Sequence, residues 1–473
     1  MRKTKIVCTL GPATQDEKMI TKMLKAGMDV ARINLSHGTH ENHEKTIKNF
    51  KRVRDSLDLP AAVLFDTKGP EIRIGKFENH KELLKNGDKF TLTTKEINGT
   101  SEIVSISYKD LPSQLKKGDT ILVDDGQIEL ETIDITNTDI VCKVISGGEV
   151  SDRKGVNIPN IHLDIPYLNE NDQNDLIFAV KQDADFIAAS FVRSEEDVIA
   201  LRNFLDYHGG YDIKIISKIE NLEGVNNFEK ILQHSDGIMV ARGDMGVEIE
   251  FERLPGLQKK FIKECYRAGK MVITATQMLE SMIHNNTPTR AEITDVANAV
   301  FDGTSAIMLS GETAVGEHPD LVVKTMAKIA RQAEKDAFEL NFYDNFQYAN
   351  NFTDVTNAIC DAACTTARDI KAKAIIAVTK SGYTARKVSK FRPKEAIIAT
   401  TPNEKTYHQL SLSWGVHPVK SLYQINAEDL FDHSVACAKR YGYVKANDCV
   451  VITAGSDNST DLLKVQTVSD REN

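Results

Sequence analysis

Short apolar runs recur along the first two thirds of the chain, and stretches with helical periodicity separate most of them. Segments such as DEKMITKMLKAG and LQKKFIKECYRAG end in glycine, which suits a helix C-cap. Eight strands are predicted, over residues 4–10, 29–35, 61–67, 185–191, 214–220, 237–243, 271–277 and 305–311. Eight strands alternating with helices indicate a parallel (β/α)8 TIM barrel, and a doubly wound open sheet is the main competing fold.

The pattern changes between the third and fourth strands, over residues 68–184. Closely spaced strands are predicted at KFTLTT, EIVSIS, TILVDDG, IELETIDI and DIVCKVI, joined by turn signals such as Asn98-Gly99 and Asp125-Gly126. This pattern predicts a small all-β domain inserted into the barrel. Gly69-Pro70 and the segment NIPNIHLDIP suit hinges at its ends, so we expect a moving lid over the active-site face.

A third unit begins near residue 345. A helix over 353–370 precedes the predicted strands AIIAVT, AIIATT, HPVKS and CVVITAG, which indicates an open α/β domain. The predicted boundaries are 1–70 and 166–344 for the two parts of the barrel domain, 71–165 for the lid and 345–473 for the C-terminal domain.

Composition and net charge restrict the possible partners, location and cysteine chemistry of the protein. The net charge of -9 argues against nucleic acid as the main partner, and no apolar run approaches the length of a membrane span. The start MRKTKIVCTLGP lacks the apolar region and cleavage site of a signal peptide, so a cytoplasmic location is expected. The seven cysteines are scattered without a CxxC pair, which predicts neither disulfides nor a zinc site.

The ends of the predicted barrel strands are polar. In TIM barrels the chemistry lies at the C-terminal ends of the strands. The side chains expected there are Arg32, Asn34, Ser36, Asp66, Thr67, Lys218, Glu220, Arg242, Gly243, Asp244, Thr276, Gln277, Ser310 and Glu312. A single polar residue of this kind is more often a helix cap or part of a loop ion pair. So many polar residues around one ring of strand ends favour an active site.

Two carboxylates in this ring suggest a metal. Glu220 and Asp244 follow adjacent strands, and two carboxylates without His or Cys suit Mg²⁺, or Mn²⁺ in its place. The backbone N–H groups of Gly243 and Asp244 could hold a substrate carboxylate. Lys218 would stabilise developing negative charge. A Schiff-base role for Lys218 is the rival interpretation, although a neighbouring carboxylate favours the charged lysine.

The C-terminal unit contains a candidate phosphate loop, TKSGYT, before a basic helix. Hydroxyls and backbone N–H groups at a helix N-terminus suit a phosphate. The residues concerned are Thr379, Lys380, Ser381, Gly382 and Thr384. An ordinary capped turn is about as compatible with the local pattern.

Several longer strings resemble those of the pyruvate kinase family, in the family's order and over essentially the whole chain. They are RINLSHGTH, DTKGPEIR, ISKIENLEGVNNF, VARGDMGVEI, TATQMLESM, TRAEITDVANAVFDGT and MLSGETAVGEHP. The resemblance implies a barrel, a lid and a C-terminal α/β domain. It also implies phosphoryl transfer from phosphoenolpyruvate to ADP, giving pyruvate and ATP, through a Mg²⁺-stabilised enolate.

Roles for single residues follow from this resemblance. Glu220 and Asp244 would hold Mg²⁺, and Lys218 and Arg32 would contact the phosphoryl group, while Gly243, Asp244 and Thr276 would hold the pyruvate moiety. K⁺ would bind to Asn34, Ser36, Asp66 and Thr67, and the nucleotide would meet Asn34, His37, Arg73 and Lys154. Candidates for protonating the enolate are Thr276, Ser310 and Glu312.

The resemblance also implies a homotetramer with an effector site in the C-terminal domain. Near the end, AGSDNSTDLLKVQTV departs from the family's usual effector loop, so the identity of a phosphorylated activator stays open. Glu71 stands where potassium-independent members carry lysine, which predicts K⁺ dependence. Two other functions stay open: a metal-dependent lyase or aldolase acting on a pyruvate enolate, and a non-catalytic metabolite sensor.

Overall fold

The computed structural model describes residues 1–343, 354–424, 426–455 and 459–470. All eight predicted barrel strands form, and they pair in parallel to close a barrel in the order β1-β17-β16-β15-β14-β13-β3-β2. They are β1 (Lys5–Thr9), β2 (Val30–Asn34), β3 (Ala62–Asp66), β13 (Phe186–Ala189), β14 (Lys214–Ile219), β15 (Gly237–Ala241), β16 (Met271–Ala275) and β17 (Ala306–Leu309). The predicted TIM barrel is confirmed, and the competing open sheet is wrong.

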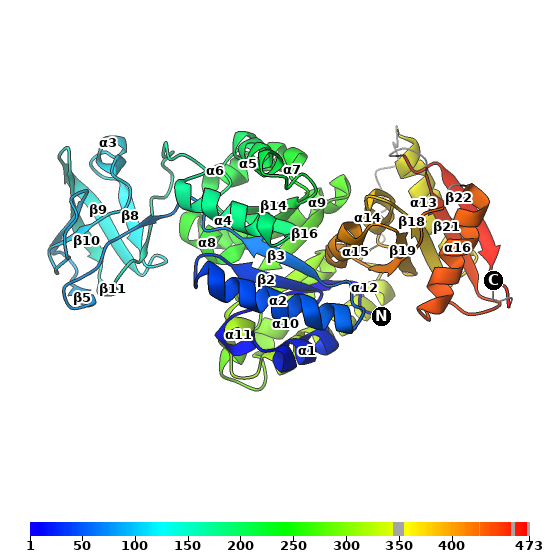
Figure 1. Ribbon diagram of the computed structural model, residues 1–473. Coiled ribbons are helices and arrows are strands. Elements are labelled where there is room, and N and C mark those ends of the chain that lie inside the picture. The colour runs from blue at the N-terminus through cyan, green and yellow to red at the C-terminus, as the bar shows by residue number, and fades with distance from the viewer. Residues whose placement is uncertain (344–353, 425, 456–458, 471–473) are drawn as a thin grey trace.

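Helices surround this barrel (Figure 1). They are α1 (Glu17–Ala26), α2 (His40–Ser56), α4 (Glu170–Lys181), α5 (Glu195–Tyr207), α6 (Leu222–Asn226), α7 (Phe228–His234), α8 (Arg242–Glu248), α9 (Leu254–Ala268), α10 (Arg290–Phe301), α11 (Gly311–Ala314) and α12 (Pro319–Glu339). The predicted glycine caps follow α1 and α9, where Gly27 and Gly269 have positive φ values of 127° and 70°. Because the strands are covered by helices outside and packed inside, they are apolar on both faces.

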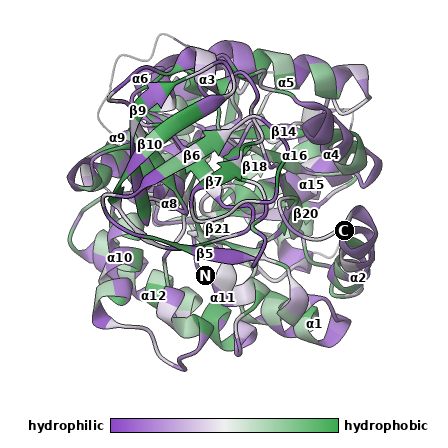
Figure 2. Cartoon of the chain, turned by 90° about the vertical axis from the view of Figure 1, so that its left-hand side faces the viewer, coloured by the Kyte–Doolittle hydropathy of each residue, from purple (hydrophilic) through white to green (hydrophobic). Residues whose placement is uncertain are grey.

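The lid lies at one end of the molecule (Figure 1). Its seven-stranded sheet has the order β4-β12-β8-β9-β10-β6-β7, and β11 and β5 form a separate pair. The strands are β4 (Ile72–Arg73), β5 (Lys81–Leu84), β6 (Lys89–Thr93), β7 (Ile103–Ser105), β8 (Thr120–Val123), β9 (Ile128–Ile135), β10 (Asp139–Ser146), β11 (Gly148–Ser151) and β12 (Gly155–Asn157), with the short helix α3 (Leu111–Gln114). Figure 2, viewed from the lid end, shows the apolar residues of β6 and β10 in front of the barrel helices.

The C-terminal unit contains a five-stranded sheet in the order β20-β19-β18-β21-β22. Its strands are β18 (Ala374–Val378), β19 (Ala396–Thr401), β20 (Val416–Lys420), β21 (Cys449–Ala454) and β22 (Leu462–Thr467), and its helices are α13 (Val355–Asp369), α14 (Tyr383–Lys390), α15 (Glu404–Gln409) and α16 (Ala427–Arg440). The four predicted strands form, while the antiparallel edge strand β22 was not predicted. The domain boundaries stay predictions, and the one at 344/345 lies outside the described residues.

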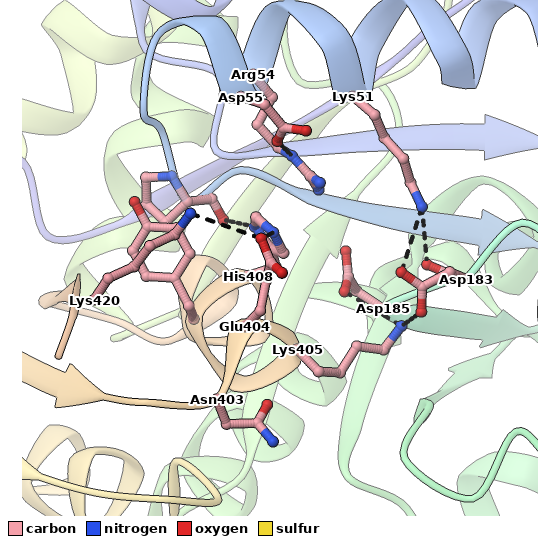
Figure 3. A network of polar contacts seen from close by, with 12 residues as sticks. Lys51, Arg54, Asp55, Asp183, Asp185, Asn403, Glu404, Lys405, His408 and Lys420 are labelled. Atoms are coloured by element: carbon pink, nitrogen blue, oxygen red, sulfur yellow. Dashed lines mark hydrogen bonds and ion pairs between the residues drawn. The ribbon is translucent and has the colours of Figure 1, made fainter. Parts of the chain in front are cut away.

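The C-terminal unit docks against the amino-terminal end of the barrel through α15 (Figure 3). Lys405 reaches Asp183 at 2.7 Å, and the side-chain amide of Gln409 donates to the backbone carbonyls of Asp185 and Asp212. Leu412, just beyond α15, belongs to the apolar cluster that fills the barrel interior. The C-terminal unit therefore closes the end of the barrel opposite the strand ends that carry the candidate chemistry.

Candidate active site

A buried charge network connects the ends of β2, β3 and β14, with β13 lying between β3 and β14. Arg32 Nε donates to Asp66 Oδ2 at 2.7 Å, and Lys218 Nζ donates to Asp66 Oδ1 at 3.0 Å. Asp66 is only 1% exposed. Although burial favours the neutral acid, the two cations hold the pKa of Asp66 below its ordinary value. One carboxylate thus fixes both an arginine and a lysine at the mouth of the barrel.

Lys218 also lies 2.9 Å from Glu220 Oε1. Burial disfavours its ammonium form, but the nearby carboxylates, Asp66 the strongest, outweigh burial and raise the pKa of Lys218. A more firmly protonated lysine is a poor amine nucleophile, which weighs against the Schiff-base interpretation. Burial, reinforced by the charge of Asp244, raises the pKa of Glu220 to about 8, although Lys218 opposes it. Glu220 and Asp244 are therefore close enough to repel each other.

Ser190 is a contact that the sequence analysis missed. Its hydroxyl accepts from Lys218 Nζ at 2.7 Å and donates to the backbone carbonyl of Thr67, also at 2.7 Å. Thr9, at the end of β1, similarly accepts from Arg32 at 2.8 Å. Both residues stand at or just after the end of a predicted barrel strand, so extending the list of strand ends to all eight strands would have found them.

The loop after β16 holds Thr276 in an unusual conformation. Thr276 and Gln277 have φ values of 68° and 53°, in the left-handed region that β-branched residues rarely adopt. Arg242 fixes this loop, because its Nη2 donates to the carbonyl of Thr276 while its Nη1 lies 2.8 Å from both carboxylate oxygens of Asp295. Gly243 N donates to Thr276 Oγ1 at 2.8 Å, so a bound carboxylate would have to share or replace this hydrogen bond.

Glu312 and Ser310 lie at the next strand end. Glu312 is fully buried, and its two oxygens accept from the backbone N–H groups of Leu279 and Ser310 at 3.1 and 2.6 Å. Burial raises the pKa of Glu312 despite these hydrogen bonds. Among the described residues no hydrogen bond joins Glu312 to Thr276, so these proton-route candidates are neighbours in the ring rather than a connected relay.

The K⁺ candidates present oxygens. Asn34 Oδ1 accepts from the backbone N–H of Ser36 at 3.1 Å, which closes a tight turn after β2. Thr67 follows β3, beside Asp66. Carbonyl, hydroxyl and carboxylate oxygens are the donor types that a hard monovalent cation requires.

The lid candidates are engaged within the lid. Lys154 pairs with Asp124 at 2.8 Å, and Arg73 pairs with Glu71 at 2.7 Å. In the part of the chain that the structure describes, neither side chain forms a hydrogen bond or ion pair with the polar residues at the ends of the barrel strands. The lid instead touches the barrel elsewhere, since Asn157 donates to Glu248 at 2.9 Å. A cavity of about 470 Å³ lies between this lid segment and the barrel, and Asp244 is part of its lining.

The histidines after β2 have ordinary structural contacts. His40 pairs with Asp175 at 2.6 Å and stacks on Phe178, and His43 bonds to the carbonyl of His37. All seven cysteines are free. Within the described ranges there is no group of three metal-ligating residues, and no helix that could cross a membrane.

In the candidate effector loop, Thr379 and Thr384 are buried. The hydroxyl of Thr384 bonds to that of Thr460 at 2.9 Å, and Lys380 Nζ donates to Tyr423 Oη at 3.3 Å. Gly382 has a φ of 80°, which glycine adopts readily. The carbonyl of Ser381 accepts from Arg386. The string AGSDNSTDLLKVQTV, which differs from the family's usual effector loop, includes residues 456–458. These three residues lie outside the described residues.

Comparison with known proteins assigns both major units. Residues 1–323 match the description "Pyruvate kinase, barrel domain", and residues 357–466 match "Pyruvate kinase, alpha/beta domain". The chain belongs to the pyruvate kinase family. The pyruvate kinase of Clostridium acetobutylicum is 49% identical over 476 residues, which cover 99% of this chain and 100% of the relative.

Two further relatives agree. The pyruvate kinase of Clostridium perfringens is 45% identical over 474 residues, covering 99% of this chain and 100% of the relative. That of Staphylococcus haemolyticus is 45% identical over 477 residues, covering 99% of this chain and 81% of the relative. The chain is thus a phosphotransferase that acts on phosphoenolpyruvate and ADP, and the lyase and sensor alternatives are set aside.

Proposed function

We propose that the ring of strand-end residues is the site of phosphoryl transfer, with Lys218 as its central cation. The observation that carries this proposal is the buried network Arg32–Asp66–Lys218–Glu220, at the barrel end where this fold performs its chemistry. Two cations held by buried carboxylates suit a substrate that carries both a phosphoryl group and a carboxylate.

The carboxylates of Glu220 and Asp244 fit a divalent metal ion. They are hard oxygen donors, they repel each other, and no His or Cys accompanies them, which suits Mg²⁺ or Mn²⁺ with several waters. Bound there, the metal would supply positive charge against the phosphoryl and enolate oxygens. K⁺ is proposed at the oxygens of Asn34, Ser36, Asp66 and Thr67.

In the proposed mechanism the residues mainly position groups and stabilise charge. Arg32 contacts the phosphoryl group, while Gly243, Asp244 and Thr276 orient the pyruvate moiety. Lys218 stabilises the charge that develops on the transferring phosphoryl and the enolate oxygen. Asn34, His37, Arg73 and Lys154 meet the nucleotide, which requires the lid residues to approach the ring. Closing the lid would exclude water as a phosphoryl acceptor.

The enolate carbon then takes a proton. Thr276, Ser310 and Glu312 are the candidates for this route. Thr276 is favoured as the residue nearest the substrate because its hydroxyl already bonds to Gly243 N, where the substrate carboxylate would bind. Glu312 and Ser310 would act by shaping the loop behind it.

An assay of pyruvate formation tests the metal proposal. Asp244→Ala and Glu220→Ala should each lower turnover by several orders of magnitude with Mg²⁺ present, because each removes one of two proposed protein anchors. Pyruvate should form from phosphoenolpyruvate only when ADP is added. Glu229→Gln, an exposed acidic position on α7, is the matched control and should leave activity unchanged. Near-normal turnover in either alanine variant would refute the assignment.

We further propose a homotetrameric assembly in the cytoplasm, regulated by a phosphorylated effector at Thr379, Lys380, Ser381, Gly382 and Thr384. The loop precedes α14 and has a backbone turn at Gly382 that leaves N–H groups at the helix start.

A further inference from the structure

A second, small cavity lies where the barrel and the C-terminal unit meet. Lys270 and Ser305 line it from the barrel, and α14 and the segment around Trp414 line it from the C-terminal unit. Its free volume is about 10 Å³, room for one particle of the size of a water molecule. We call it the junction cavity. It lies at the C-terminal end of α14, and the proposed effector loop precedes that helix.

Three residues that line the junction cavity carry donors without a partner. Among the described residues, Arg392 Nε, Ser413 Oγ and Trp414 Nε1 have no hydrogen-bond partner. The three residues are only 4%, 2% and 1% exposed. Guanidinium and indole N–H groups can only donate, and the hydroxyl of Ser413 can donate as well, so an acceptor in the cavity is what these positions lack. Buried donors of this kind normally have a partner.

The cavity is also strongly cationic. Lys270, Arg386, Lys390 and Arg392 line it, and no carboxylate does so in the ranges that the structure describes. Lys270 and Arg386 donate to uncharged acceptors, the carbonyls of Gln233 and Ser381. Burial, opposed by Asp236, lowers the pKa of Lys270 and of Arg386. An anion would offset this accumulated charge.

We propose that the junction cavity binds a single monatomic anion, such as chloride, and that this anion fastens the C-terminal unit to the barrel. The donors of Arg392, Ser413 and Trp414 would be its ligands. A water oxygen has two lone pairs and normally accepts two hydrogen bonds, whereas a monatomic anion can accept from all three donors.

Crystals grown without halide and soaked in sodium bromide give the direct test. An anomalous peak in the junction cavity, within hydrogen-bond distance of Trp414 Nε1, is expected. A cavity that holds only a water molecule, without an anomalous signal at full bromide concentration, would overturn the proposal. An ion that is seen in the crystal but has no effect in solution would also overturn it, as an adventitious ion only.

Thermal unfolding provides the solution test. Replacing potassium gluconate by potassium chloride at constant ionic strength keeps K⁺ fixed. Ser413→Ala and Trp414→Phe each remove one proposed ligand, so chloride should raise their Tm by at least 2 °C less than it raises that of the unsubstituted protein, a rough figure for saturating ligand. Ser411→Ala is the matched control, because Ser411 donates to the carbonyl of Pro60 at the same junction.

The Ser411→Ala substitution should lower Tm by the same amount in both salts. The rise in Tm on adding chloride should be as large as in the unsubstituted protein. An equal chloride response in Ser413→Ala, Ser411→Ala and the unsubstituted protein would refute the proposal. This comparison decides the matter even if Trp414→Phe fails to fold.

Discussion

At the scale of single residues, the proposed active site is organised around charges withdrawn from water. Asp66 receives Arg32 on one oxygen and Lys218 on the other, and it is almost inaccessible. Breaking such a buried pair leaves an uncompensated charge, which typically costs about 3–5 kcal/mol. The two cations are therefore held in place before any substrate arrives, as electrostatic catalysis requires.

Lys218→Met tests this preorganisation. Because the proposed interaction is strongest in the transition state, the variant should lower kcat by roughly 100-fold or more and change KM for phosphoenolpyruvate much less. Steady-state kinetics at saturating ADP measure both quantities. Lys230→Met, which removes an exposed lysine paired with Glu195, is the matched control. An unchanged kcat with a large loss of affinity would assign Lys218 to ground-state binding.

Glu71 is predicted to make the enzyme dependent on K⁺. It pairs with Arg73 near the lid hinge, and a lysine at this position could supply an ammonium charge in place of the ion. Activity should be low in sodium or Tris buffers and be restored by K⁺, whereas Glu71→Lys should have a much smaller K⁺ requirement. Glu71→Gln removes the carboxylate without adding a cation. Comparing it with Glu71→Lys separates the effect of losing the negative charge from the effect of gaining a positive one. Equal rates of the unsubstituted enzyme with and without K⁺ would contradict the prediction.

At the scale of elements, α15 connects the C-terminal unit to the barrel. His408 is buried at this contact, where its Nδ1 bonds to the carbonyl of Pro60 at 3.3 Å (Figure 3). Burial, aided by the charge of Arg54, lowers the pKa of His408 to about 4. The imidazole is therefore neutral when α15 is docked.

This pKa predicts acid sensitivity. Between about pH 6.5 and pH 4 the unfolded state binds a proton at His408 that the folded state does not, so stability falls as the pH is lowered through this range. The full loss is about 3 kcal/mol. His408→Asn can keep the donor to Pro60 and should reduce the fall in Tm between pH 7 and pH 5.

His284→Asn is the control, because His284 is exposed beside Glu317. His417, whose pKa burial lowers to about 2, contributes equally to all three proteins and does not affect the comparison. A fall in Tm that is the same in His408→Asn as in the unsubstituted protein would show that His408 does not carry this sensitivity.

At the scale of the whole molecule, the barrel lies between two units with different proposed tasks (Figure 1). The lid carries nucleotide candidates at one end, and the C-terminal unit closes the other end with Leu412. Thr406 on α15 donates to the carbonyl of Lys380 in the proposed effector loop at 2.9 Å. The effector loop is thus in direct contact with the helix that docks onto the barrel.

The effector proposal predicts a regulatory phenotype. A sugar phosphate or nucleoside monophosphate should raise the apparent affinity for phosphoenolpyruvate, with a coupling of about 1–3 kcal/mol. Ser381→Asp combined with Thr384→Asp should abolish this activation and keep the rate at saturating substrate. Because Thr384 is buried against Thr460, Ser381→Asp alone is measured beside the double variant. Activation of both variants to the level of the unsubstituted enzyme would show that the loop is only a capped turn.

The local sequence determined the eight barrel strands and most of their polar ends, because strands buried on both faces are continuous apolar runs and their ends are interrupted by polar residues. Only the tertiary structure decided which of these residues meet. Asp66 and Lys218 are 152 positions apart, and their contact depends on strand order and register. The edge strand β22 was missed because an exposed edge lacks a strong apolar pattern. Ser190 could have been found as a strand-end residue, but its contact with Lys218 and the grouping of the junction-cavity donors depend on distant partners, which local periodicity does not encode.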